Sequence, residues 1–429
     1  MKKTFLLPAL LICSLLSGYA LSEEEEPRKN VFEALKEKIP VRGFIEYGYG
    51  RRITSDDTQK HDTLYNEARL QLDYNHAWEN IEVQFKGDAV YDGFLGEALF
   101  DWRETYAILS PADWTEAKLG RQILTWGTGD YLFINDMFPK DWVSFFIGRD
   151  DEYLKAPSNS VKLSLFPDVF DINMVWTPKF TPDEYVTGQR LSYYNPLTQQ
   201  ISGSKNLIYA EDPEGNIENG EFALRIYKNI KGYELAGYAY KGFFKRPEGF
   251  DPRLWKNYFP KLAVYGGSIR GNILGGIGNA EFGYYDSIED RRGDNPMIEN
   301  SSARGLLGYK REIVKDFSAG LQWYFEYMRN YDEYDETYLN DPVQKDRFRQ
   351  LLTLRLTRYA MMQNLIISLF SFYSPTDNDA YLRPSVTYKY NDHLSFAVGG
   401  NIFLKKYEHT FFGQLEDNTN IYIRARYSF

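Results

Sequence analysis

Residues 420–429, which read NIYIRARYSF, form the segment that decides the fold of this protein. Apolar and aromatic residues occupy every second position from Ile421 to Phe429, whereas Arg424 and Arg426 stand on the opposite face. An alternation with period two predicts a β-strand whose two faces meet different surroundings. Segments of about ten such residues with one apolar face are typical of transmembrane β-barrel strands.

The same alternation recurs along the chain from Val41 onward. It predicts about 18 strands, an even number as bacterial barrels have. We expect these strands to begin near the following residues: Arg42, Leu64, Ile81, Phe100, Glu116, Asn159, Phe170, Glu221, Tyr233, Lys261, Gly275, Ala303, Phe317, Arg347, Gln363, Tyr381, Leu394 and Asn420.

The lengths of the connections separate a barrel from a soluble β-sandwich, which also alternates. Every second connection is short, such as 111–113 and 315–316, whereas those between them are mostly long and polar, such as 127–158 and 181–220. Short periplasmic turns opposite long external loops are the arrangement of outer-membrane barrels. We therefore predict an all-β, single-domain, antiparallel up-and-down barrel over residues 41–429, with both of its ends on the periplasmic side.

The first residues indicate export across a membrane. Lys2 and Lys3 precede an apolar run over 5–16, and Ala20-Leu21-Ser22 suits cleavage, so we predict a signal peptide over 1–22. The alternative is a retained anchor, but the run is shorter than the roughly 20 residues that a spanning helix needs. Residues 23–40 are charged and form an N-terminal periplasmic segment, either a short helix or partial plug or a solvated leader.

Composition excludes several classes of function. The only cysteine, Cys13, falls in the predicted signal peptide, which removes disulfides, thiolate metal sites and cysteine nucleophiles from the mature chain. The formal net charge of -10 argues against nucleic-acid binding. Aromatic residues make up 17% of the chain, a content that suits the aromatic girdles of a membrane barrel.

The histidines argue against an enzyme in the barrel wall. The chain has 4 of them, and each falls in or beside a predicted turn or loop: His61, His76, His393 and His409. No Ser-His pair at plausible depth emerges, and no two histidines stand at metal-ligand spacing. We therefore expect no catalytic residues, no metal and no cofactor.

The face opposite the apolar stripe lines the lumen, and in the C-terminal half it is basic, with Glu281 and Glu326 as its main acids. Rings of Arg or Lys make anion-selective pores, and guanidinium groups bind carboxylate or phosphate through two hydrogen bonds. The alternative is that these side chains pair with lumen carboxylates and brace the wall. The predicted solute-contacting set is Arg304, Lys310, Arg347, Arg349, Arg355, Arg383, Lys389, Arg424 and Arg426.

Residues 127–158 form the most individual segment. It is too aromatic to float in water as a simple external loop, and long loops without secondary structure of their own are usually functional. We expect it to fold into the lumen, to constrict it and to bring its charged residues against the arginine-rich wall. The alternative is a lid over the mouth. The predicted constriction residues are Trp126, Asp130, Asp136, Lys140, Trp142, Arg149 and Asp150.

Two strings carry a resemblance to a known family. GRQILTWGTGD at 120–130, followed by INDMFPKDW at 134–142, and EDNTNIYIRARYSF at 416–429 resemble proteobacterial outer-membrane barrels related to alginate-export porins. They also resemble uncharacterised barrels with a Gly-Arg-Gln-x-x-x-Trp-Gly strand end. The resemblance implies eighteen strands, an arginine-lined lumen and passive passage of an anionic polymer or a small anion. It further implies that the barrel assembly machinery recognises the terminal aromatic residue.

Together these features predict an outer-membrane channel for diffusion or export of anionic solutes, with an acidic polysaccharide among the candidates. Its expected partners are outer-membrane lipid, the assembly machinery and the solute, and not nucleic acid. The main rival is a barrel sheath around a periplasmic electron carrier or secretion partner, which would need a wide, unobstructed lumen. An outer-membrane enzyme is the weaker rival.

Overall fold

The computed structural model describes residues 41–337 and 343–429. The predicted signal peptide 1–22 and the segment 23–40 lie outside these residues. The chain divides into two units, Met1–Val41 and Arg42–Phe429, and the second contains the barrel.

The barrel is one closed antiparallel sheet of 18 strands, and this confirms the predicted fold class. Consecutive long strands pair, and β1 (Val41–Arg52) pairs with β23 (Asn420–Ser428) to close the sheet. Every predicted strand is present, and its start is displaced by a few residues at most. The others are β2 (Thr63–Ala77), β3 (Ile81–Asp92), β4 (Glu97–Ala112), β5 (Thr115–Gln122), β6 (Ser158–Leu165), β7 (Asp171–Thr177), β11 (Glu221–Ile230), β12 (Tyr233–Phe243), β15 (Lys261–Ile273), β16 (Gly276–Ser287), β17 (Ser302–Val314), β18 (Phe317–Met328), β19 (Phe348–Ala360), β20 (Leu365–Ser374), β21 (Asp379–Lys389) and β22 (Leu394–Leu404).

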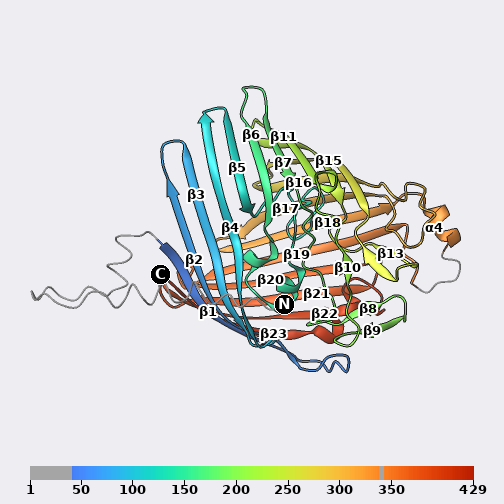
Figure 1. Ribbon diagram of the computed structural model, residues 1–429. Coiled ribbons are helices and arrows are strands. Elements are labelled where there is room, and N and C mark those ends of the chain that lie inside the picture. Colours follow the sequence, from blue (N-terminus) through green and yellow to red (C-terminus); the bar gives the residue numbers. More distant parts are fainter. Residues whose placement is uncertain (1–40, 338–342) are drawn as a thin grey trace, which may run out of the picture. The chain divides into compact units, whose positions relative to one another are not determined.

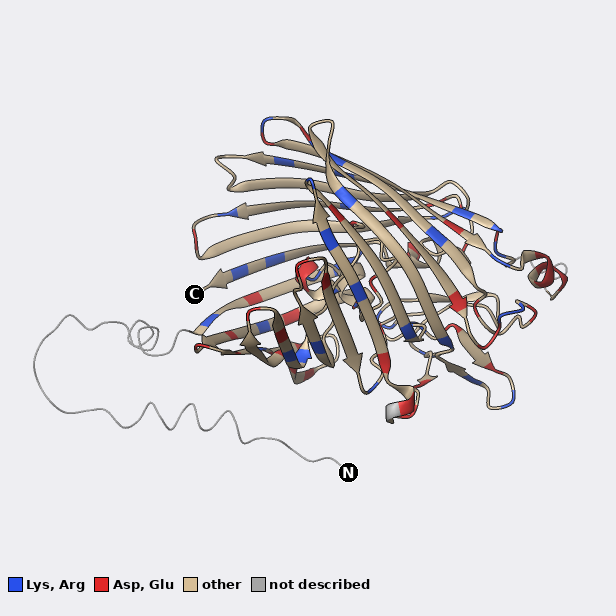
Figure 2. Cartoon of the chain, turned by 90° about the horizontal axis from the view of Figure 1, so that it is seen from above, with Lys and Arg blue, Asp and Glu red and all other residues tan. Residues whose placement is uncertain are grey.

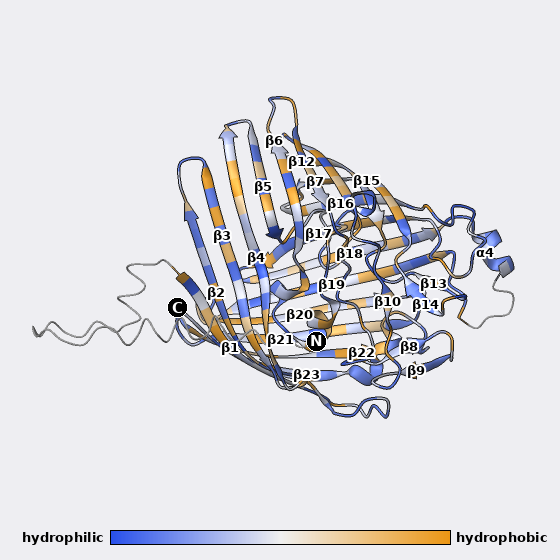
Figure 3. Ribbon diagram, viewed as in Figure 1, coloured by the Kyte–Doolittle hydropathy of each residue, from blue (hydrophilic) through white to orange (hydrophobic). Residues whose placement is uncertain are grey.

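Hydrophobic and hydrophilic residues alternate along the strands (Figure 3), and successive side chains of a strand point to opposite faces of the wall. On the outer face, Ile45, Ile423 and Tyr427 are 55%, 56% and 50% exposed although they are apolar or aromatic. On the inner face, Glu46 lies opposite Arg426 in the register of β1 and β23. Apolar side chains that a closed barrel exposes on its outer face are those that meet lipid.

The two ends of the barrel differ as the sequence predicts. At one end the strands are joined by short turns, among them 231–232 and 274–275. The residues of both turns, Lys231-Gly232 and Leu274-Gly275, have positive φ, as type I′ hairpin turns require. At the other end lie the long connections 53–62, 123–157, 178–220, 244–260, 288–301, 329–347 and 405–419, together with two short ones, 93–96 and 375–378.

Several small elements gather among the long connections at the end of the barrel away from the C-terminus (Figure 1), whereas others belong to the connection 123–157. Within the described part of the chain, no helix has the length and apolar character needed to cross a membrane. The small elements are α3 (Trp142–Ile147), α4 (Tyr331–Thr337), η1 (Asp151–Leu154), η2 (Ile217–Asn219), η3 (Gly413–Asn418), β8 (Tyr193–Asn195), β9 (Gln200–Ser202), β10 (Ala210–Glu211), β13 (Gly249–Asp251) and β14 (Lys256–Tyr258).

Three neighbouring strands are too short to cross a bilayer alone. β5, β6 and β7 have 8, 8 and 7 residues, whereas a tilted membrane strand needs about 9–11. β4 pairs with β5 only as far as Thr105 and continues beyond it to Glu97. The connection 123–157 therefore leaves the wall nearer the middle of the barrel than Glu97, where β4 begins. From this position it can enter the lumen.

Apolar packing fills part of the interior. Inward residues of the wall, including Leu306, Leu351 and Phe403, form one buried cluster with Ile134 and Phe146 of the connection 123–157. Burial of each such large apolar side chain contributes about 1.5–3 kcal/mol. The barrel therefore encloses a packed core as well as charged groups, which recur along its strands (Figure 2).

Candidate functional site

The strand end at 120–127 directs the chain away from the wall. Gln122 is fully buried at the end of β5, where its side-chain amide donates to the carbonyl oxygen of Ser160 on β6 (3.0 Å). Gly127 has φ +81°, and a Cβ there would lie 2.9 Å from Oε1 of Glu281. Both the conformation and the close approach favour glycine. Trp126 packs edge-on against Phe138 (4.9 Å between ring centroids).

Glu281, on the inner face of β16, receives the incoming chain. Its Oε2 accepts hydrogen bonds from the backbone N–H (2.6 Å) and hydroxyl (3.0 Å) of Thr128. Its Oε1 accepts from the backbone N–H (2.9 Å) and side-chain amide (3.0 Å) of Asn135. One buried carboxylate therefore satisfies four donors of the connection and fixes where it crosses the lumen.

The short helix α3 packs its apolar face against β21 and β22. Asp141 caps it by accepting from the backbone N–H of Ser144 (2.7 Å), and Gly148 ends it in the left-handed conformation, at φ +91°. Phe145 lies against Tyr381 and Phe146 against Phe403, with ring centroids 5.8 and 5.6 Å apart. The connection 123–157 is thus attached to inner faces on several sides of the barrel.

Carboxylates of the connection pair with four of the predicted arginines. Arg355 donates a hydrogen bond from Nη2 to Asp130 (2.8 Å), and its Nε forms an ion pair with the other oxygen of the same carboxylate (2.6 Å). The other pairs are Arg383 with Asp151 (2.9 Å), Arg424 with Asp150 (2.7 Å), and Arg426 with Glu152 (3.2 Å) and with Glu46 of β1 (2.8 Å). Of these carboxylates, Asp130 and Asp150 are among the predicted constriction residues, and Asp151 and Glu152 continue the same acidic run.

Two further predicted arginines pair with the rim of the wall. Arg304 lies 3.0 Å from Glu326, and Arg349 lies 2.6 Å from Asp377. Arg347 is not brought to the lumen, since it lies over the ring of Tyr327, an outward-facing residue (5.3 Å). The two predicted lysines, Lys310 and Lys389, make no ion pair with any residue of 41–337 or 343–429.

Three other predicted loop residues have different partners. Asp136 and Lys140 are both buried and form an ion pair with each other (3.0 Å) instead of meeting the arginine-rich wall. Trp142 donates its indole N–H to Asp183 (2.9 Å), and burial raises the pKa of that carboxyl. These contacts stabilise the connection itself.

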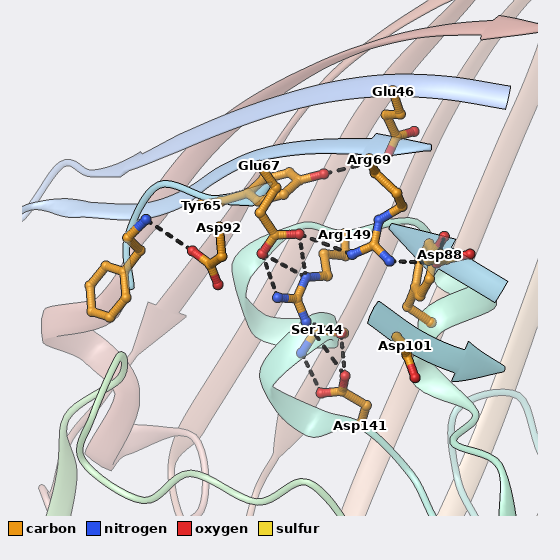
Figure 4. A network of polar contacts seen from close by, with 12 residues as sticks. Glu46, Tyr65, Glu67, Arg69, Asp88, Asp92, Asp101, Asp141, Ser144 and Arg149 are labelled. Carbon is orange, nitrogen blue, oxygen red and sulfur yellow. Dashed lines mark hydrogen bonds and ion pairs between the residues drawn. The ribbon is translucent and has the colours of Figure 1, made fainter. Parts of the chain in front are cut away.

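Arg149 meets a network of charged residues on the inner wall that contains Glu67 (Figure 4). Its guanidinium donates to both carboxylate oxygens of the buried Glu67 on β2. Glu67 also pairs with Arg69 (3.0 Å), which in turn pairs with Asp88 (2.5 Å). Arg149 is a predicted constriction residue, but its partner Glu67 could not be predicted, because it lies 82 residues away in the chain.

The pKa values of two carboxyl groups of the connection are shifted in opposite directions. Burial by itself would raise the pKa of Asp150, but the guanidinium groups of Arg424 and Arg426 outweigh it and hold the pKa below its ordinary value. Burial raises the pKa of Asp130, and the nearby Arg355 and Lys310 offset only part of that effect. Asp130 is therefore the more easily protonated of the two.

The connection separates two cavities. An outer cavity of about 510 Å³, on the side of the long loops, is lined by Phe133, Trp142, Arg304 and Arg349 among others. An inner cavity of about 810 Å³, on the side of the short turns, is lined among others by Asp130, Lys310 and Arg355. Of the arginine–carboxylate pairs of the connection, the pair of Arg355 and Asp130 therefore faces the inner cavity.

A closed 18-stranded antiparallel barrel with an apolar outer face is the fold of the outer-membrane porin barrels. OccAB3 of Acinetobacter baumannii is similar with a TM-score of 0.55 and 9% identity, over 91% of this chain and 98% of that one. OccK5 (OpdH) of Pseudomonas aeruginosa is similar with a TM-score of 0.53 and 10% identity, over 91% and 96%. OccK11 (OpdR) of Pseudomonas aeruginosa is similar with a TM-score of 0.51 and 11% identity, over 90% and 95%.

At this identity the likeness shows the fold alone. No protein-family model matches the sequence, and no curated protein matches it either.

Proposed function

We propose that this protein is an outer-membrane channel for passive diffusion of small anionic solutes. The observation that supports it is the position of Arg355, Arg383, Arg424 and Arg426, which project from the inner wall onto the connection between two cavities. Guanidinium groups in a confined, low-dielectric passage attract anions, and each guanidinium can bind two oxygen atoms of one anion. Lys310, without an ion-pair partner in the described chain, adds positive charge to the inner cavity.

The pairing of these arginines with carboxylates limits the attraction. A wall of unpaired arginines would hold anions tightly, whereas paired ones exchange partners with a passing anion. The arginines both brace the connection and bind solute, so the two interpretations of the basic wall are compatible. We expect a moderate anion preference.

An acidic polysaccharide is the alternative solute, and it is supported by the resemblance of 120–130 and 416–429 to alginate-export porins. The packed interior favours small anions, because a polymer would need the connection 123–157 to move aside. The same packing disfavours the sheath around a periplasmic partner. We assign the protein no catalytic activity and no cofactor.

The proposal extends to export and assembly. We propose that residues 1–22 are a signal peptide that is cleaved on export in a Gram-negative cell. We also propose that the barrel assembly machinery recognises the last strand, which ends in Phe429.

Neutralising two inward arginines tests the proposed function. In planar bilayers under a salt gradient, the wild-type protein should give a reversal potential on the anion side. We expect R355Q/R383Q to lower the anion-to-cation permeability ratio several-fold, because the lumen keeps Asp130 and Asp151 but loses their partners. R253Q, at an exposed loop tip, is the control and should leave the ratio unchanged. A non-selective wild-type channel, or a ratio that the double substitution leaves unchanged, would contradict the proposal.

A further inference from the structure

The segment Gly129–Tyr131 forms a partition between the two cavities. Gly129 and Asp130 line the inner cavity, whereas Tyr131 and Leu132 line the outer one. One turn of backbone therefore separates the two chambers at this point. A movement of this segment would therefore connect the two cavities.

The backbone of the partition is clamped on one side. The side-chain amide of Gln322 on β18 accepts from the N–H of Asp130 (2.7 Å) and donates to its carbonyl oxygen (3.0 Å). The same amide donates to the hydroxyl of Thr353 (2.8 Å), which fixes its orientation. The main chain at Asp130 is therefore held in place independently of its carboxylate, which Arg355 binds.

The next residue is strained. Tyr131 has φ +59°, in the left-handed region that residues with a Cβ seldom adopt. Such conformations persist only where the surroundings over-determine them, and they cluster at functional sites. Here the phenol ring is held by Phe145 and Phe370, at centroid distances of 5.1 and 4.8 Å, and its hydroxyl donates to Asp151.

Two arginines flank the same ring. The guanidinium carbon of Arg355 lies 4.8 Å and that of Arg383 lies 5.4 Å from the centroid of Tyr131. Each arginine is held by a carboxylate of the connection, Asp130 and Asp151 respectively. The side chains of these two carboxylates are 42% and 50% exposed, so a dissolved anion can compete with them.

We propose that Asp130 and Asp151 occupy the positions on Arg355 and Arg383 that the carboxylate groups of a transiting solute take, and that their displacement releases Tyr131 and opens the partition. The inference rests on the proposed function and adds a gate to it. Because the resident groups are carboxylates, carboxylate solutes fit the vacated positions best. Because both arginines contact one ring, a short dicarboxylate can engage both at once.

Charge-neutral amides at the two carboxylates test the gate. D130N and D151N keep the shape of each side chain but weaken its hold on arginine, because the charge is lost. In planar bilayers, we expect each variant to raise the anion-to-cation permeability ratio several-fold. We also expect sodium succinate to block chloride current at about tenfold lower concentration, which corresponds to a gain of about 1.4 kcal/mol in binding. D168N, in an exposed turn, is the control for loss of a charge alone.

Removing the ring tests the partition itself. Y131G removes the phenol and relaxes the left-handed strain, so single-channel conductance should rise at least twofold. Because glycine tolerates positive φ, this variant should fold normally, and heat-modifiable migration in gels checks that. Y390A, at an exposed tyrosine in a short turn, is its control.

The outcomes separate the gate from the proposed function. If the wild type prefers anions and R355Q/R383Q abolishes the preference, but D130N, D151N and Y131G match the wild type, the gate is wrong and the channel proposal stands. If the wild type shows no anion preference, the channel proposal fails, and the gate fails with it.

Acidification provides an independent test. The charged groups that face Asp130 are Arg355 on β19, Lys310 on β17 and Asp151 on η1. Because burial raises the pKa of Asp130 above its ordinary value of 3.8, the carboxyl is neutralised at a pH above that value as the pH falls. Arg355 is then freed for solute, so the anion preference should increase on acidification through this range. In D130N this part of the increase should be lost, and an unchanged pH profile in D130N would overturn the role of Asp130.

Discussion

R149M should lower the free energy of unfolding of the barrel by about 3–5 kcal/mol, the range for removing one partner of a buried ion pair. Glu67 is only 1% exposed, and Arg149 donates to both of its carboxylate oxygens. Without Arg149 the buried carboxylate keeps Arg69 (3.0 Å) but loses its two-oxygen contact. Urea unfolding of protein refolded into lipid vesicles, followed by tryptophan fluorescence, measures the change.

The double substitution E67Q/R149M is the matched control. It removes the stranded carboxylate, and the remaining arginines keep their own partners, since Arg69 pairs with Asp88 and Arg190 with Asp92. We therefore expect the double variant to recover most of the loss, because removing both charges of a buried pair is often nearly neutral. A single variant within 1 kcal/mol of the wild type, on the scale of an exposed ion pair, would show that this network does not hold the connection in place.

The strand pattern could be predicted because one physical requirement governs it. A wall with lipid on one side and polar or packed groups on the other imposes period-two alternation on every strand, so the number and starts of the strands follow from the sequence. The same parity places Arg304, Arg355 and Arg424 on the inner face. The predicted inward orientation is wrong at Arg347. This residue precedes β19, and beyond the strand the alternation no longer fixes the direction of the side chain.

The partners of the inner residues could not be predicted. Glu281 accepts a hydrogen bond from the backbone of Thr128, which is 153 residues away in the sequence. Arg424 donates to Asp150, which is 274 residues away. Inward Phe370, Phe372 and Tyr381 also break the polar inner pattern, because they pack against the connection and not against water. Such contacts depend on how one long segment folds into the lumen, and local periodicity contains no information about that.

Loosening the apolar contacts of α3 should have the largest effect on transport. Phe145 and Phe146 are 2% and 3% exposed and pack on Tyr381 and Phe403 of the far wall. F145A/F146A removes both rings, at a cost of about 3–5 kcal/mol for each in a well-packed core. Because these contacts hold the connection across the lumen while the 18 paired strands stay intact, the cost falls on the connection and not on the barrel. We expect single-channel conductance to rise several-fold.

F145L/F146L is the conservative control, because leucine keeps apolar contacts at both positions, and its conductance should stay close to that of the wild type.

Conductance that is unchanged in F145A/F146A, together with faster proteolysis within 123–157, would mean that the connection has loosened without being the barrier to flow. The barrier would then be the wall side chains themselves, with Arg304 and Arg349 at the outer cavity as the next groups to neutralise. An increase confined to the alanine variant would identify packing, and not charge, as what limits conductance. Charge would then determine which solutes pass, and the aromatic contacts of α3 would determine how fast they do.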